Sequence, residues 1–85
     1  MRSFAHVIAD CAGLHARSCV VITHEAAKWE SKVTVTLGEF QADGKRMAPL
    51  MELHAHSGDT LVVCCEGPDE AQAALALEAL MRMSI

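Results

Sequence analysis

Aromatic residues are scarce in this chain of 85 residues, which has two phenylalanines, one tryptophan and no tyrosine. It therefore lacks the stacking platforms on which single-stranded nucleic acids are usually bound. Basic residues are also few, because seven Lys and Arg stand against eleven Asp and Glu, for a formal net charge of -4. These cations are scattered, whereas nucleic-acid-binding domains gather theirs into a patch. We expect no nucleic-acid partner.

Long hydrophobic runs are absent too. No apolar stretch approaches the roughly 20 residues that a membrane-spanning helix needs, so we expect no stable membrane insertion. No signal peptide is recognisable, which favours a cytoplasmic, reducing compartment. The sequence has no linker or internal repeat, and 85 residues leave room for one small domain only, over 1–85.

The four cysteines do not form a recognisable disulfide framework or zinc motif. Cys64 and Cys65 are adjacent, and neighbours on a strand point to opposite faces. No CxxC pair typical of zinc sites occurs, and the only cluster of possible ligands combines these two cysteines with His54 and His56. We expect no metal ion or other cofactor. The cysteines are interpreted as small buried hydrophobic residues: Cys11, Cys19, Cys64 and Cys65.

Hydrophobic periodicity predicts seven secondary-structure elements. Alternating or β-branched segments predict strands over residues 3–9, 32–37, 40–42 and 60–65, and apolar spacings of three and four predict helices over 16–28, 46–53 and 71–83. Gly38-Glu39 is a two-residue break of hairpin type between the second and third strands. This order predicts an α+β fold in which helices cover one side of an antiparallel sheet.

Two of the predicted helices have signals at their starts. Pro49 is tolerated only in a first turn, where its missing N–H has no intrahelical partner, so the middle helix should begin near Arg46. Gly67-Pro68 ends the last strand, and Asp69 is then a candidate N-cap of the last helix. The charge of Glu70 suits the positive end of that helix dipole.

The segment Gly13-Leu14-His15-Ala16-Arg17-Ser18 places a histidine between a turn glycine and the first turn of a predicted helix. Free backbone amides and the helix dipole favour an anion there, and Arg17 adds a cation. An imidazole offers a neutral nucleophilic nitrogen near pH 7. We interpret His15 as a phosphorylation site with the amides of Ala16 and Arg17 as anion donors. The spacing alone is equally compatible with an ordinary histidine at a helix start.

Four motifs follow one another along the predicted elements. They are Gly13-Leu14-His15-Ala16-Arg17, then Gly44-Lys45-Arg46-Met47 with Leu50-Met51-Glu52-Leu53, then Ser57-Gly58-Asp59-Thr60, and finally Gly67-Pro68-Asp69-Glu70-Ala71. With them the chain resembles, nearly end to end, the HPr family of histidine-containing phosphocarriers in the bacterial sugar phosphotransferase system. The resemblance implies an open-faced β-sandwich, with three helices on one face of a four-stranded antiparallel sheet.

The resemblance also implies a function. Members of the family accept a phosphoryl group from phosphorylated enzyme I, itself charged from phosphoenolpyruvate, on Nδ1 of the histidine that matches His15. They pass it to a IIA component or a related regulator, and the arginine that matches Arg17 steadies the phosphate. The protein would then be a phosphoryl carrier rather than a self-standing enzyme, and we expect a monomer.

A docking surface is implied as well. Val20, Met47, Ala48 and Met51 match family positions that contact enzyme I and IIA partners, and flexible methionines suit a surface that must fit several shapes. Lys45 and Arg46 would add a basic rim that speeds association with an acidic partner. The spacing of four between Met47 and Met51 is equally that of a buried helical stripe.

The chain departs from the family at three positions. Arg46 stands where many members have a serine that a dedicated kinase phosphorylates, so we expect no such regulation. Ser18 replaces a usual proline, and Ala12 replaces a polar residue. Three alternatives remain: a regulatory homologue like the nitrogen-branch carrier, a metal- or thiol-binding module built on His54, His56, Cys64 and Cys65, and a purely structural interaction domain.

Overall fold

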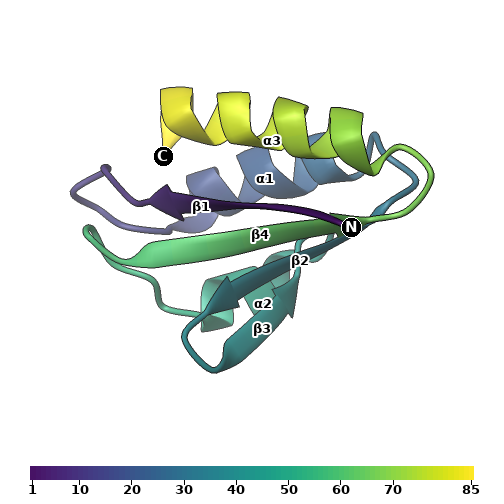
Figure 1. The fold of residues 1–85 in the computed structure, drawn as a ribbon. Helices are drawn as coiled ribbons and strands as arrows, with labels where there is room; N and C mark the ends of the chain where they lie inside the picture. Colours follow the sequence, from purple (N-terminus) through teal and green to yellow (C-terminus); the bar gives the residue numbers. More distant parts are fainter.

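Four antiparallel strands form one sheet in the computed structural model, which describes residues 1–85 (Figure 1). The strands are β1 (Arg2–Val7), β2 (Lys32–Leu37), β3 (Phe40–Asp43) and β4 (Thr60–Glu66), and the helices are α1 (Ala16–Ala26), α2 (Met47–Glu52) and α3 (Glu70–Ser84). The strand order is β1-β4-β2-β3. All seven predicted elements are present in the predicted order, so the α+β prediction is confirmed.

The two central strands show why the sheet packs on one face. In β4, Leu61, Val63 and Cys65 are fully buried, and Val33 and Val35 of β2 lie beside them in register. The helices supply the opposing side chains of the core, which are Cys19, Ile22 and Ala26 from α1, Leu50 from α2, and Ala73, Leu77 and Met81 from α3. Alternation of period two therefore sends every second strand residue toward the helices.

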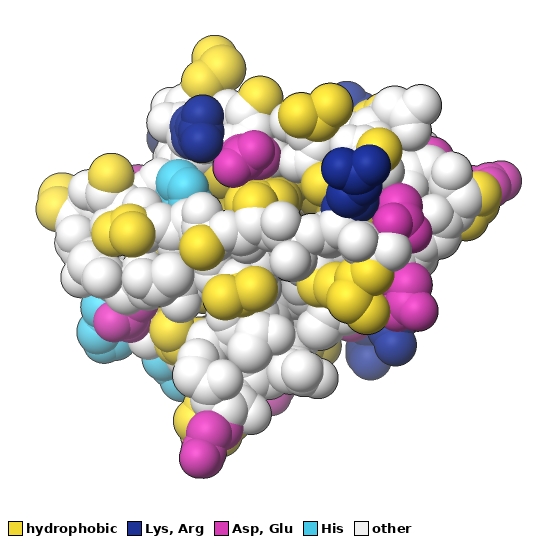
Figure 2. Space-filling view, in the orientation of Figure 1, with side chains coloured by type: hydrophobic (Ala, Val, Ile, Leu, Met, Phe, Trp, Pro, Cys, Tyr) yellow, Lys and Arg dark blue, Asp and Glu magenta, His cyan; other side chains and the backbone are white.

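The other face of the sheet is open. Val7 and Val62 point away from the helices and are 58% and 42% exposed. In Figure 2 the hydrophobic side chains form interrupted patches rather than one continuous apolar surface. None of the three helices combines the length and the apolarity that crossing a bilayer requires.

The end of β1 and the end of α1 differ from the prediction. Beyond Val7 the chain leaves β4, because the amides of Ala9 and Asp10 donate to the carbonyl of Ile85 at 2.8 and 2.9 Å. α1 ends at Ala26 rather than near residue 28, and a turn with i to i-3 bonds follows, including one from the amide of Trp29 to Ala26. Such tightened turns are common where a helix runs out of carbonyl partners.

α2 starts as its proline requires. Its N-cap is Arg46, so Pro49 falls in the first turn as predicted. The helix ends at Glu52, and His54 then adopts a left-handed conformation with φ of 52°. A residue in this conformation commonly terminates a helix, and here it turns the chain toward β4.

The start of α3 differs from the predicted capping arrangement. Asp69 does occupy the N-cap position, but its side chain makes no capping bond. Its carboxylate instead accepts the amides of Glu30 and Ser31 at 2.9 and 3.0 Å, and also the Ser31 hydroxyl. The Ser31 hydroxyl, followed by the Glu30 amide, lowers the pKa of Asp69 below its ordinary value. Gly67 allows this junction, because a Cβ there would lie 2.7 Å from the Ser31 Cα.

Candidate functional site

The loop between β1 and α1 is fixed against the loop that precedes β4. The amide of Leu14 donates to the carbonyl of Ala55 at 2.9 Å. Gly13 has φ of 71°, and a Cβ at this position would lie 2.6 Å from the same carbonyl. Both the backbone conformation and the close approach therefore require glycine. This contact fixes the backbone position of the next residue, His15.

His15 is the N-cap residue of α1. Its backbone is extended, with φ of -117° and ψ of -179°, and its carbonyl accepts the first intrahelical bond from Cys19 at 2.9 Å. Its side chain makes no capping bond, and the first turn contains no acidic residue. The amides of Ala16, Arg17 and Ser18 have no acceptor in the protein. The positive end of α1 is thus uncompensated, which is the condition for anion binding.

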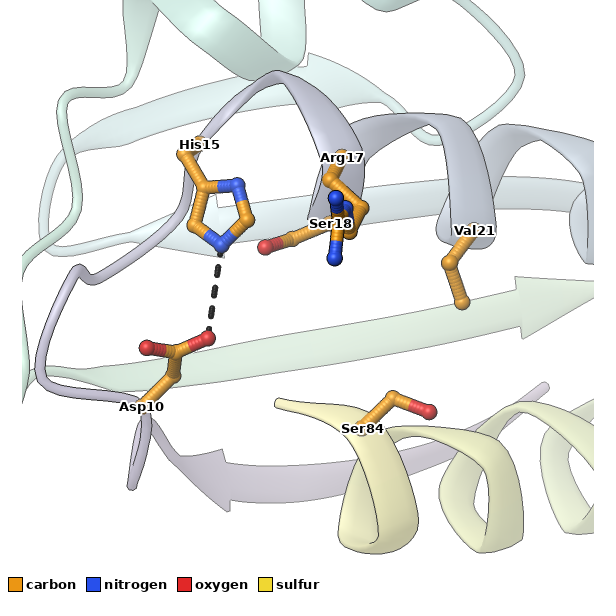
Figure 3. A pocket seen from close by; sticks show the side chains of 6 residues that line it. All are labelled: Asp10, His15, Arg17, Ser18, Val21 and Ser84. Atoms are coloured by element: carbon orange, nitrogen blue, oxygen red, sulfur yellow. Dashed lines mark hydrogen bonds and ion pairs between the residues drawn. The ribbon is translucent and has the colours of Figure 1, made fainter.

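Asp10 holds the imidazole from one side. Its Oδ2 lies 3.3 Å from His15 Nε2, and its Oδ1 accepts the amide of Ala12 at 2.9 Å. These bonds, the Ala12 amide first and the His15 ring second, lower the pKa of Asp10. An ionised carboxylate can only accept, so Nε2 is the donor, and in the neutral imidazole Nδ1 then keeps its lone pair. Figure 3 shows Nδ1 on the side of the ring that faces Arg17 and Ser18.

A cavity of about 290 Å³ lies in front of this ring. Arg17 is exposed and takes part in none of the ion pairs of the protein. An anionic group on Nδ1 would therefore meet an unpaired guanidinium and three free amides. The cavity is lined by Asp10, His15, Arg17, Ser18 and Val21, together with Ser84 from the last turn of α3 (Figure 3).

Asp10 is the site residue that sequence reasoning missed. It directly follows the strand predicted over residues 3–9, and no motif marks it as a functional residue. Its role depends on the loop turning back on itself, where the amide of Gly13 donates to the Asp10 carbonyl at 2.9 Å. The available signal was a carboxylate five residues before a candidate nucleophilic histidine, a spacing without a regular periodicity.

The predicted docking residues lie on α1 and α2, which pack against each other. Val20 is 53% exposed and Met51 is 42% exposed, while Ala48 is exposed. Met47 is half-buried against the core, and its sulfur lies 3.6 Å from the Thr23 hydroxyl of α1. Met51 is therefore a surface residue, whereas Met47 has both core and surface contacts.

Lys45 does not contribute to a basic rim as predicted. Its Nζ donates to the carbonyl of Trp29 at 2.7 Å, and its side chain is half-buried. This bond anchors the loop before α2 to the turn that follows α1. Only Arg46 is left as an exposed cation at this edge.

The histidine and cysteine cluster does not converge. Cys65 faces the core and is fully buried, whereas Cys64 lies on the opposite face of β4, and both histidines of the cluster are exposed. No group of three or more His, Cys, Asp or Glu side chains is placed to hold a metal ion. All four cysteines are free. Cys11 is exposed in the His15 loop and Cys64 is half-buried, so the prediction that all four are buried holds only for Cys19 and Cys65.

The fold and the site together define a class of protein. An open-faced β-sandwich with a half-exposed histidine at an uncapped helix N-terminus has the arrangement of a small histidine phosphocarrier. Residues 3–83 match the family model described as "PTS HPr component phosphorylation site". The chain belongs to the HPr family, the phosphocarriers of the phosphotransferase system.

Similar proteins support this assignment. The phosphocarrier protein HPr of Mycoplasma capricolum is 32% identical over 81 residues, covering 95% of this chain and 91% of the relative. That of Neisseria meningitidis serogroup A is 38% identical over 69 residues, covering 81% and 78%. A solved mycoplasma histidine-containing phosphocarrier superposes with a TM-score of 0.94 at 30% identity, covering 98% and 94%. HPr from Thermoanaerobacter tengcongensis gives 0.91 at 28%, covering 96% and 92%. The open-faced sandwich is confirmed.

Proposed function

We propose that this protein accepts a phosphoryl group from phosphorylated enzyme I on Nδ1 of His15 and passes it to a IIA component. One observation supports the site above the others. The carboxylate of Asp10 is hydrogen-bonded to Nε2 of the ring, while Nδ1 lies next to the uncapped first turn of α1 and the unpaired Arg17. In this proposal the carrier works as a cytoplasmic monomer with a single domain, 1–85.

The transfer needs no proton relay. The Nδ1 lone pair of His15 forms a bond to phosphorus while the bond between phosphorus and the donor nitrogen breaks, and its electron pair returns to the donor imidazole. The proton on Nε2 stays between His15 and Asp10. Phosphoryl transfer passes through a loose transition state, so the work of the protein is alignment and charge stabilisation. Asp10 provides the alignment, and Arg17 with the amides provides the charge.

A carrier must also release its cargo. The His15 side chain is 37% exposed and its cavity is open to solvent, so the phosphoryl group would be stabilised from one side only. An enclosing set of donors would hold it too tightly for onward transfer. The exposed Val20, Ala48 and Met51 would dock partners beside the histidine, with Arg46 as the charged edge.

The test is incubation with phosphoenolpyruvate and enzyme I, followed by intact mass measurement. We expect one acid-labile phosphoryl group on the wild type and none on His15→Ala. His24→Ala is the matched control, because His24 is an exposed histidine of the same helix, and it should be phosphorylated normally. An adduct that survives His15→Ala would contradict the proposal.

The onward step is tested separately. The phosphorylated protein, freed of enzyme I and phosphoenolpyruvate, is mixed with a purified IIA component. The phosphoryl group should move from the carrier to the IIA component within the mixing time of the experiment. If the phosphoryl group stays on a carrier that is phosphorylated at His15, that IIA component is excluded as the acceptor, and a regulator is the alternative.

A further inference from the structure

Ser18, the third residue of α1, combines burial with an unused hydroxyl. The residue is only 4% exposed, yet it lines the cavity in front of His15. None of the side-chain hydrogen bonds of the protein involves it. Among the side-chain polar atoms that are fully enclosed, only His6 Nε2 lacks a hydrogen-bond partner. The Ser18 oxygen lacks a partner too, so it is not fully enclosed. The hydroxyl therefore retains access to the cavity while the rest of the side chain is packed.

Such an arrangement is unusual for a helical serine. Buried hydroxyls are normally hydrogen-bonded, and in a helix the ordinary acceptor is a carbonyl one turn earlier. Ser18 makes no such bond. A side chain at the third helical position can turn back toward the N-cap residue, as in a capping box. Figure 3 shows the Ser18 hydroxyl directed toward the imidazole of His15.

We propose that the Ser18 hydroxyl donates a hydrogen bond to the phosphoryl group on His15, which makes Ser18 a phosphoryl-binding residue of this carrier. The inference rests on the proposed function. The proline that the family usually has at this position offers no donor. Because the bond exists only in the phosphorylated state, it shifts the equilibrium between enzyme I and this protein toward the phosphorylated carrier. It also holds the phosphoryl group on the Arg17 side of the ring.

Ser18→Ala tests this inference, with Ser3→Ala as the matched control. Ser3 is an exposed serine of β1 that does not line the cavity in front of His15. Each variant is equilibrated with enzyme I and phosphoenolpyruvate at fixed pyruvate, and the phosphorylated fraction and the ³¹P chemical shift of phosphohistidine are measured. Ser18→Ala should lower the equilibrium constant by about 10-fold or more, the size of one hydrogen bond to a charged group.

The ³¹P shift should also move in Ser18→Ala, whereas Ser3→Ala should match the wild type in both measurements. The unphosphorylated proteins should unfold at similar temperatures, because the Ser18 hydroxyl has no partner to lose. Equal equilibria and equal ³¹P shifts in Ser18→Ala and wild type would overturn the inference and leave the proposed function intact. Equal effects of the two variants would also overturn it. A wild type that is not phosphorylated on His15 would overturn both.

Discussion

The helices α1 and α3 begin in opposite ways. At the start of α3, the Asp69 carboxylate accepts three hydrogen bonds from residues 30 and 31, and Glu70 supplies a negative charge in the first turn. Glu70 also accepts the amide of Gly67 at 3.2 Å. At the start of α1, His15 makes no capping bond and the first turn has no acidic residue. The first turn of α3 thus carries its own negative charge, whereas the first turn of α1 carries none and is open to an anionic ligand.

Asp10 and Asp69, which lie near the starts of these two helices, also differ in what they hold in place. Asp10 and Asp69 both have a lowered pKa because each accepts hydrogen bonds. The partners of Asp69 belong to the segment that leads into β2, so its bonds tie two distant parts of the chain together. The partners of Asp10 are a neighbouring amide and the ring of His15. Substitution of Asp69 should therefore affect folding, and substitution of Asp10 should affect transfer.

The largest effect is expected when the start of α1 is made to resemble that of α3. Arg17→Glu removes the unpaired cation and places an acid in the first turn. Phosphorylation by enzyme I should slow by about 100-fold or more, comparable to the loss of one donor to a transition-state anion. The fold should be retained, because acids are favourable at helix starts. Initial rates of phosphoryl transfer and thermal unfolding check both parts.

Lys32→Glu is the control for Arg17→Glu, since it changes the net charge equally on the exposed first residue of β2. Its rate should stay within about twofold of the wild type, because surface charges separated by more than a Debye length are largely screened. A comparable loss in both variants would mean that overall charge, and not the start of α1, controls the reaction.

Asp69→Asn should destabilise the fold and leave phosphorylation unchanged at temperatures where the variant is folded. The pKa of Asp69 is lowered in the folded state. Its contribution to stability is therefore fully present above the unfolded pKa of about 3.9 and is lost as pH falls through the folded pKa. The difference in Tm between wild type and Asp69→Asn should be constant near pH 6 and shrink as pH falls below about 4. A pH-independent difference would contradict this account.

Asp10→Asn should give the converse result. Asparagine can still accept the Ala12 amide, but it no longer offers a charged acceptor to His15 Nε2, so the tautomer with a free Nδ1 is less favoured. We expect the transfer rate to fall by about 10-fold, as when a partner that orients a functional imidazole is removed. The variant should unfold close to the wild-type Tm. A large stability loss with normal transfer would assign Asp10 a structural role.

The elements of the fold could be predicted because their signals are local. Alternation in β2 and β4 depends on each strand's own residues, as do the spacings along α1 and α3. The end of β1 could not be predicted, since it depends on the Ile85 carbonyl from the far end of the chain. The role of Asp69 was missed for the same reason, because Ser31 is 38 residues away.

The candidate site, like the fold, could be predicted where its signals are local. His15 and Arg17 belong to a contiguous motif, so the sequence pattern alone identifies them as candidates. The orientation of the ring depends on how the loop folds back to bring Asp10 to Nε2. The unused hydroxyl of Ser18 depends on the packing around the first turn of α1. Both are properties of three-dimensional placement that residue spacing does not encode.

The smallest effect is expected for Glu70→Gln, which separates charge from geometry at the start of α3. The hydrogen bond from the N-terminal ammonium, followed by the one from the Gly67 amide, lowers the pKa of Glu70. Glutamine can still accept the amide of Gly67 through its side-chain oxygen. The ion pair with the N-terminal ammonium and the interaction with the helix dipole are then lost, so Tm should decrease slightly at low salt. Because salt screens exposed charges, the difference should largely disappear near 1 M NaCl. The Asp69→Asn difference should persist there, since it arises from direct hydrogen bonds; if both differences disappear together, the start of α3 is stabilised by charge alone.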